Sequence, residues 1–194
     1  MVRSVTPTLV SVAHSLQTQR RSRGSQRWAF DLEFPAMSRA DWAPIFAFLV
    51  KQRGRYETFQ WTLPTGLVTP RGALGGSPLV DNEVGSPTAV QTGTRSLNTK
   101  GWSNNITGVL KAGDFILPTG GSGKVYMVTA DCDSGASGLS AVPIEPSLID
   151  AIPHGQAITV TSVPFTVGVA RESLESALDL GPQHALSLEL VEMV

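Results

Sequence analysis

Short stretches in which apolar and polar residues alternate recur along the chain, and this alternation limits the possible folds more than any other feature. In the clearest stretch, residues 28–34, a tryptophan, two phenylalanines and a leucine alternate with an alanine and two acids. A period of two residues is typical of a β-strand with one buried face. Similar patterns predict further strands at 8–15, 56–63, 78–84, 90–97, 105–110 with 114–117, 124–130, 139–145, 157–163, 165–171 and 186–191, while 173–180 fits either a helical turn or an irregular strand.

The turns between these stretches indicate how two pairs of strands associate. Segments 8–15 and 28–34 flank an arginine-rich turn, so antiparallel pairing is their simplest arrangement. Segments 124–130 and 139–145 flank residues 131–138, whose glycines, serines and aspartates favour a β-hairpin.

Only one stretch has a strong helical signal. Its large apolar residues recur at intervals of three and four and so share one helix face; they are Trp42, Ile45, Phe46 and Leu49. Ser38 and Asp41 are both candidate N-terminal caps, but only Asp41 leaves Pro44 in the first turn, where a missing N–H has no cost. We therefore expect a helix over residues 42–53, ended by Gly54.

One helix among about ten short strands predicts a mainly β fold. Nineteen glycines and thirteen prolines among 194 residues agree with a loop-rich chain, and twelve of the glycines lie between residues 64 and 124. The chain has no apolar run of the length that a membrane helix needs, so we expect no membrane insertion. Its single cysteine excludes a disulfide scaffold.

Charge is scarce and unevenly placed. Only 16% of the residues are charged, and the formal net charge is −1, yet residues 1–60 carry +5 and the remaining residues −6. A surface poor in charge is a feature of interface cores. The densest basic cluster consists of Arg20, Arg21, Arg23 and Arg27. It is either a solvated basic edge or a contact with an oppositely charged face of a neighbouring subunit. Nucleic-acid recognition is less favoured, because the chain has no zinc-finger spacing and no RNA-recognition aromatic motif.

No pattern in the chain predicts catalysis, a metal or a cofactor. Cys132 has no histidine near it in sequence. Residues 120–124 resemble part of a phosphate-binding loop, but Val125 replaces the Ser/Thr that holds magnesium and Pro118 replaces the first glycine. Residues 131–135 resemble the start of a calcium loop, but its required glycine and bidentate acid are replaced. The three histidines are His14, His154 and His184. Each stands alone in the sequence, without another metal-binding residue at the spacing of a metal site. We therefore expect a protein that is not an enzyme.

Three longer stretches carry a resemblance to a known family. The first runs from QRW at 26–28 through PAM at 35–37 to QRGR at 52–55 and LP at 63–64. The second comprises AVQTG at 89–93, LKAGDF at 110–115 and GKVYMVTAD at 123–131, and the third comprises VPIEPSL at 142–148 and PHG at 153–155. This pattern of strand, glycine turn and strand resembles the distal tail proteins, which are tail-tip ring proteins of long non-contractile-tailed bacteriophages.

The resemblance implies a structural role in the virion, at the distal end of the tail. It implies a ring of six copies that joins the tail tube protein to the hub and host-recognition proteins, with DNA only passing through the lumen. Residues 1–79 and 164–194 would form the ring domain, a β-sandwich or barrel with one flanking helix. Residues 80–163 would form a small inserted β-barrel or sandwich, reached through a linker at 71–78.

Two alternatives stay open. The chain is either another ring of the same tail, such as a tube terminator, or a carbohydrate-binding β-sandwich that attaches to host glycans. In the second case Trp102, the one aromatic side chain of the inserted domain suited to stacking on a sugar, would be the binding residue. In a ring, arginines crowded on the bore would hold passing DNA through counterion release, so we expect Arg20–Arg27 to face another protein.

Overall fold

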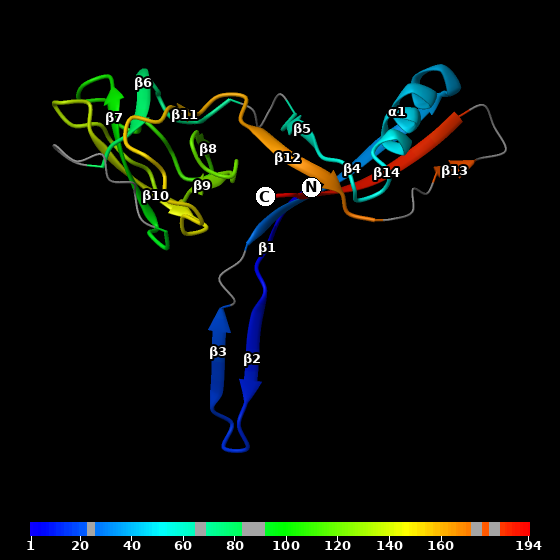
Figure 1. The fold of residues 1–194 in the computed structure, drawn as a ribbon, viewed down its shortest axis with the longest axis horizontal. Coiled ribbons are helices and arrows are strands. Elements are labelled where there is room, and N and C mark those ends of the chain that lie inside the picture. Colours follow the sequence, from blue (N-terminus) through cyan, green and yellow to red (C-terminus); the bar gives the residue numbers. More distant parts are fainter. Residues whose placement is uncertain (23–25, 65–68, 83–91, 172–175, 179–182) are drawn as a thin grey trace. The chain divides into compact units, whose positions relative to one another are not determined.

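The computed structural model describes residues 1–22, 26–64, 69–82, 92–171, 176–178 and 183–194, which form strands and one helix. This confirms the predicted mainly β class. The chain divides into two compact units: unit 1 comprises residues 1–60 and 166–193, and unit 2 comprises residues 61–165. Unit 2 is thus inserted, in sequence, between the two parts of unit 1 (Figure 1).

The main sheet of unit 1 is organised around two long strands from opposite ends of the chain. β4 (Arg27–Ser38) pairs antiparallel with β14 (Gln183–Glu192), from Val191 opposite Ala29 to Gln183 opposite Ser38. The strand order is β1-β4-β14-β12-β5, and β13 also pairs with β14. The remaining bounds are β1 Val2–Val5, β5 Phe59–Thr62, β12 Pro164–Val169 and β13 Ser176–Leu178.

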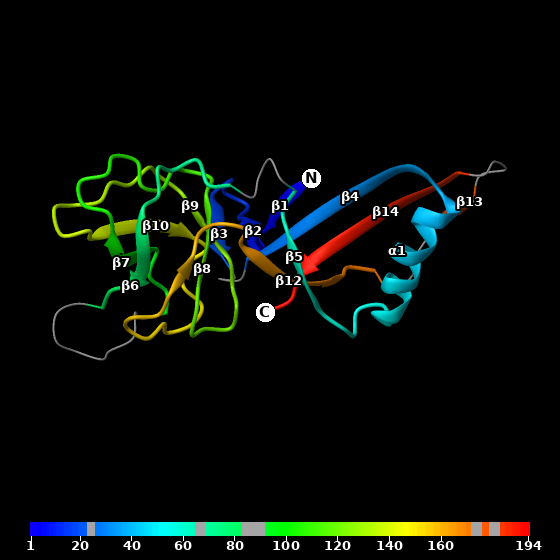
Figure 2. The same cartoon turned by 90° about the horizontal axis from the view of Figure 1, so that it is seen from above.

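The alternation at 28–34 does predict a strand with a buried side, since Phe30 is fully buried. The helix α1 (Arg39–Lys51) contacts both β4 and β14, and Figure 2 shows it beside this strand pair. Trp42 of α1 stacks on Phe46 and on His184 of β14, with ring centroids 4.7 and 4.8 Å apart. The predicted apolar face of the helix therefore does pack on the sheet.

A charge conflict within this sheet is resolved by the edge strand. Asp31 and Glu189 lie directly opposite each other in β4 and β14, where like charges repel. Arg3 of β1 donates hydrogen bonds to both carboxylates, with an Nη2–Oδ1 distance of 2.7 Å to Asp31. The bonds to Glu189 and Asp31 raise the pKa of the Arg3 guanidinium above its usual value. Because these side chains are partly exposed, the ion pairs themselves contribute little to stability. The main effect of Arg3 is to cancel the repulsion between Asp31 and Glu189.

The predicted helix start is wrong by one turn. Ser38, not Asp41, is the N-cap: its Oγ accepts from the Asp41 N–H at 3.3 Å and donates to the Asp41 carboxylate at 2.7 Å. This reciprocal pair satisfies a free backbone donor, and it outweighs the interior position that it gives Pro44. The helix ends at Lys51, and Arg53 and Gly54 follow with positive φ angles of 53° and 66°.

Removing the Ser38 hydroxyl tests this cap. We expect Ser38→Ala to lower the free energy of unfolding by about 1 kcal/mol, because the Asp41 N–H loses its acceptor. Ser38→Asn keeps an acceptor and serves as the control, and chemical unfolding followed by circular dichroism measures both. Equal stability of the Ala and Asn variants would show that Asp41 caps the helix after all.

The predicted pairing of segments 8–15 and 28–34 is also wrong. β1 takes that edge of β4, with Val2 opposite Phe30 and Val5 opposite Arg27. β2 (Thr8–Val12) instead pairs with β3 (Thr18–Ser22) in a sheet of two strands. Pairing across this five-residue turn closes a shorter loop than pairing with β4, so less chain entropy is lost.

Unit 2 is a nearly closed antiparallel barrel of six strands in the order β11-β8-β9-β10-β7-β6. A bridge between Leu79 and Ala157 joins the first and last strands, supported by a 2.8 Å bond from the Val80 N–H to the Gln156 carbonyl. The predicted pairing of segments 124–130 and 139–145 is confirmed as β9 with β10. The strand bounds are β6 Gly76–Val80, β7 Ser96–Trp102, β8 Phe115–Pro118, β9 Tyr126–Val128, β10 Ser140–Glu145 and β11 Ile158–Thr159.

The strand predicted at 105–110 is absent. Asn105 and Gly108 have φ angles of 56° and 65°, which a strand does not allow, and only an isolated bridge joins Leu110 to Cys132. The strand predicted at 90–97 lies further along, at β7.

Residues 71–78, expected to be a linker, are bonded into unit 2. The buried Asp114 carboxylate accepts the backbone N–H groups of Arg71 at 2.7 Å, Gly72 at 3.1 Å and Lys111 at 2.8 Å. The Ala73 N–H donates to the Gly108 carbonyl at 2.8 Å. A Cβ on Gly72 would lie 2.3 Å from the Val109 carbonyl oxygen, so only glycine permits this approach. One aspartate therefore holds two loops together.

Substitution of Asp114 measures that role. We expect Asp114→Ala to lower the free energy of unfolding by about 3 kcal/mol, because three partly buried N–H groups lose a charged acceptor. Asp114→Asn keeps one oxygen and should lose less. Urea unfolding followed by tryptophan fluorescence gives both values, and an Ala variant as stable as the wild type would contradict this account.

Candidate protein interface

The hairpin of β2 and β3 with its turn, residues 8–22, is the most exposed part of unit 1, and we call it the arm. Each described side chain from Thr8 to Arg21 is exposed. Four of these side chains are large aliphatics, with exposed fractions of 48% for Leu9, 60% for Val10, 60% for Val12 and 84% for Leu16. A two-stranded hairpin is marginally stable by itself, and clustered exposed aliphatics mark an interaction surface.

The register of the arm gives both faces a similar character. Arg21 lies opposite Leu9 on one face, and Arg20 lies opposite Val10 on the other. Residues directly opposite in an antiparallel pair share a face, so each face joins an aliphatic side chain to a guanidinium. Arginine and apolar groups together are typical of protein interfaces.

The predicted basic cluster is only partly brought together. Arg20 and Arg21 lie in the arm but on opposite faces, and the exposed Arg27 lies in another sheet, opposite Val5. Arg23 lies outside the described residues. Arginines that point to opposite sides do not form one phosphate-binding surface, so this arrangement favours protein contacts over DNA contacts.

The turn of the arm contains a strained residue. The Leu16 N–H donates to the Ala13 carbonyl, and the Ala13 N–H donates to the Gln17 carbonyl, both at 2.9 Å. Leu16 has a φ of 63°. A turn followed by one left-handed residue is a common three-residue hairpin loop, and glycine is the usual residue at that last position. A leucine there costs about 1 kcal/mol of backbone strain and presents its side chain to solvent.

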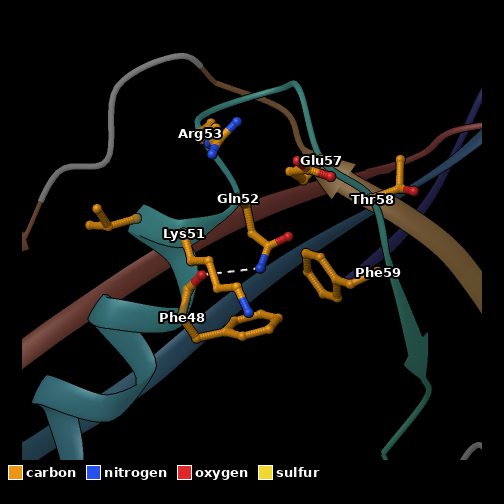
Figure 3. A pocket seen from close by; sticks show the side chains of 8 residues that line it. Phe48, Lys51, Gln52, Arg53, Glu57, Thr58 and Phe59 are labelled. Carbon is orange, nitrogen blue, oxygen red and sulfur yellow. Dashed lines mark hydrogen bonds between the residues drawn. The ribbon is translucent and has the colours of Figure 1, made fainter.

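Unit 1 also contains a hollow of about 570 Å³ between the C-terminal end of α1 and the start of β5, and we call it the α1–β5 hollow (Figure 3). Phe48 and Phe59 line it, with their ring centroids 5.1 Å apart in an edge-to-face arrangement. The buried Gln52 stabilises the wall of this hollow. Its side-chain amide donates to the Phe48 backbone carbonyl, and its backbone carbonyl accepts from the Glu57 N–H, both at 3.1 Å. The charged lining residues are Lys51, Arg53 and Glu57.

Folding largely removes the charge asymmetry seen in the sequence. Unit 1 comprises residues 1–60 and 166–193, whose sequence holds ten Lys/Arg and nine Asp/Glu, a net charge of +1. Residues 61–165 hold five and seven, a net charge of −2. Attraction between oppositely charged units is therefore weak, and apolar contacts must carry more of any association.

Trp102, the candidate sugar-stacking residue, lies in the barrel core. Only 4% of its surface is exposed, and its indole N–H donates to the Thr99 hydroxyl at 2.7 Å. A ring in this position offers no open face to a sugar.

The histidines have local structural contacts. His154 accepts the Asn82 N–H at 3.1 Å and lies 2.7 Å from the Lys100 ammonium, which ties loops of the barrel to β7. His184 stacks on α1, and His14 is exposed in the turn of the arm. Within the described part of the chain, no group of three or more His, Cys, Asp or Glu residues is placed to hold a metal ion. No helix among those residues is long and apolar enough to cross a membrane.

Sequence reasoning missed the most distinctive residues of this surface. Leu9, Val10 and Val12 have the spacing of an ordinary half-buried strand, and only their exposure distinguishes them. Leu16 carried no signal, because a positive φ is not visible in an alternating pattern. Phe48 and Phe59 come from different elements, and only the fold brings them together.

Comparison with known proteins adds no family assignment: no family model matches the chain, and no curated protein matches it.

The thiol of Cys132 provides a test of this description of the barrel. Burial raises its pKa, and its Sγ points to the Leu110 carbonyl at 3.7 Å. A raised pKa leaves less thiolate at any pH below it, so we expect slower reaction with a disulfide reagent at pH 8 than for the unfolded chain. Rates measured with and without denaturant test this, and equal rates would mean that Cys132 is open and reactive.

Proposed function

We propose that this chain is a structural subunit of a bacteriophage tail tip. Copies of the chain form a ring between the tail tube and the hub, and the family resemblance implies six copies. The observation that carries the proposal is the arm, whose two faces and tip expose aliphatic side chains and which pairs with no other described strand. A surface of this kind is stabilised by a partner. The resemblance to distal tail proteins supplies the biological setting.

A ring follows naturally from an arm on each copy. A contact between an arm and a different surface of the next copy is heterologous, and such contacts close into rings when the rotation allows it. The low charge content also supports repeated burial of surface, because interface cores are depleted in charge. The tail tube protein and the hub proteins are the further partners in this proposal, and DNA is only cargo in the lumen.

The alternatives are supported to different degrees. A different ring of the same tail, such as a tube terminator, would need the same kind of arm. A monomeric carbohydrate-binding module would leave the arm uncovered, and its one candidate stacking residue is the buried Trp102. The arm thus favours the ring proteins as a class over the glycan-binding module.

The mass of the purified chain tests the proposal. We expect native mass spectrometry and light scattering to give one closed assembly, at six times the 20.6 kDa chain mass for a hexamer. Negative-stain images of it should show a ring. A chain that stays monomeric at high concentration and binds glycans would instead establish the carbohydrate-binding alternative.

The arginines of the arm make a second test. We expect Arg20→Ser with Arg21→Ser to weaken assembly by roughly three- to tenfold, since charges at the edge of an interface contribute modestly. Arg39→Ser with Arg95→Ser removes the same charge from exposed positions elsewhere and serves as the control. If the arm variant assembled normally but changed DNA ejection from phage particles, the arginines would face DNA.

A further inference from the structure

Leu16 combines two features that point to a binding role. It occupies a left-handed position where glycine is the usual residue, and it is the most exposed of the described large apolar side chains. Neither feature stabilises the arm itself. An observed backbone outlier at the tip of an exposed hairpin is a reason to look for a contact that needs this side chain.

The same chain offers a recess that suits an aliphatic side chain. The α1–β5 hollow has two phenylalanine rings in its wall, and its volume of about 570 Å³ exceeds that of one leucine side chain several-fold. Phe48 and Val50 beside it are 45% and 54% exposed. A leucine inserted there would bury its own apolar surface together with part of these side chains.

The tip of the arm can enter the hollow without burying a formally charged side chain. The hollow is lined by Lys51 and Arg53, which would repel the guanidinium groups of the arm, and by Glu57, which would attract them. The tip, residues 13–17, has no Lys, Arg, Asp or Glu, and Arg20 lies three strand pairs from it. At about 3.4 Å per residue, the backbone of Arg20 lies roughly 10 Å from the turn. Insertion of the Leu16 side chain alone therefore leaves the backbone of Arg20 outside the hollow.

We propose that Leu16 of one copy inserts into the α1–β5 hollow of the next copy, as the anchor of the head-to-tail contact. This inference rests on the proposed ring function and adds the residue and the receptor surface to it. The arm tip and the hollow are different surfaces of one chain, so the contact is heterologous, and every copy in a closed ring both gives and receives one tip. An aliphatic side chain buried in a pocket at an interface centre contributes to binding through the apolar surface that it removes from water.

Leu16→Gly separates binding from folding. Glycine relieves the left-handed strain, so the monomer should be at least as stable as the wild type by thermal unfolding. We expect assembly to weaken on the order of tenfold to a hundredfold, because the anchor is lost. Leu16→Met keeps an apolar side chain of similar volume and should assemble like the wild type.

Filling the hollow is the reciprocal change. Thr58→Trp places a large ring at an exposed lining position, and we expect the same loss of assembly. Ser137→Trp adds the same ring at an exposed position of unit 2 and is the control.

Mixing the two variants gives the decisive result. Leu16→Gly chains keep the hollow and Thr58→Trp chains keep the tip, so each variant alone should stay monomeric at concentrations where the wild type just assembles. The mixture can make one contact but no closed ring, and light scattering should show a one-to-one pair. If the wild type forms a ring and Leu16→Gly assembles equally well, the anchor is refuted and the ring function stands. If the wild type never assembles, both are refuted.

A covalent test does not depend on the strength of the ring. A Leu16→Cys chain mixed with a Thr58→Cys chain should form an intermolecular disulfide under mild oxidation, while Cys132 stays buried. Leu16→Cys with Ser137→Cys is the control pair. Equal cross-linking of the two pairs would overturn the proposed contact.

Discussion

The antiparallel pairing of β4 with β14 is the interaction on which the rest of the structure depends. It joins residues near the two ends of the chain, so everything between Trp61 and Phe165 becomes an insertion with its own barrel. It also provides the surface that α1 contacts, where Trp42 stacks on His184. The pairing creates a repulsion between Asp31 and Glu189, and β1 contributes Arg3 to cancel it.

The same pairing explains why the arm has no sheet to join. β14 occupies one edge of β4 and β1 occupies the other, so the next two strands pair only with each other. Within the described residues of unit 1, their aliphatic side chains are exposed. The structure thus exposes the aliphatic side chains of an ordinary alternating sequence, and in our proposal the α1–β5 hollow of a second copy receives the tip.

A structural feature could be predicted from the sequence where neighbouring residues determine it, and could not where residues far apart in sequence determine it. The strand at 28–34 and the apolar face of the helix were predictable, because each follows from the spacing of neighbouring residues. The partner of β4 was not, because strand pairing is decided by chain entropy and by competition between segments far apart in sequence. At the helix start, two local rules conflicted, and the capping bond of Ser38 prevailed over the preference of Pro44 for the first turn.

The candidate interface was predictable only in part. The basic residues of the arm were identified from composition, but Arg27 belongs to a different sheet from Arg20 and Arg21. Leu16 escaped notice because backbone conformation, not residue type, makes it unusual. The charge asymmetry of the sequence was misleading as well, because residues 166–193, with five acids and one arginine, belong to the same unit as the basic residues 1–60.

The central claim is that another copy of the chain covers the arm, and hydrogen–deuterium exchange across a range of protein concentrations tests it most directly. An uncovered two-stranded hairpin opens easily, so its amides exchange quickly in a dilute monomer. The account predicts that the amides of residues 8–12 and 18–22 become protected at the concentrations where assembly forms, together with those around residues 48–59. Rapid exchange of the arm within a fully formed assembly, or full protection already in the dilute monomer, would contradict it.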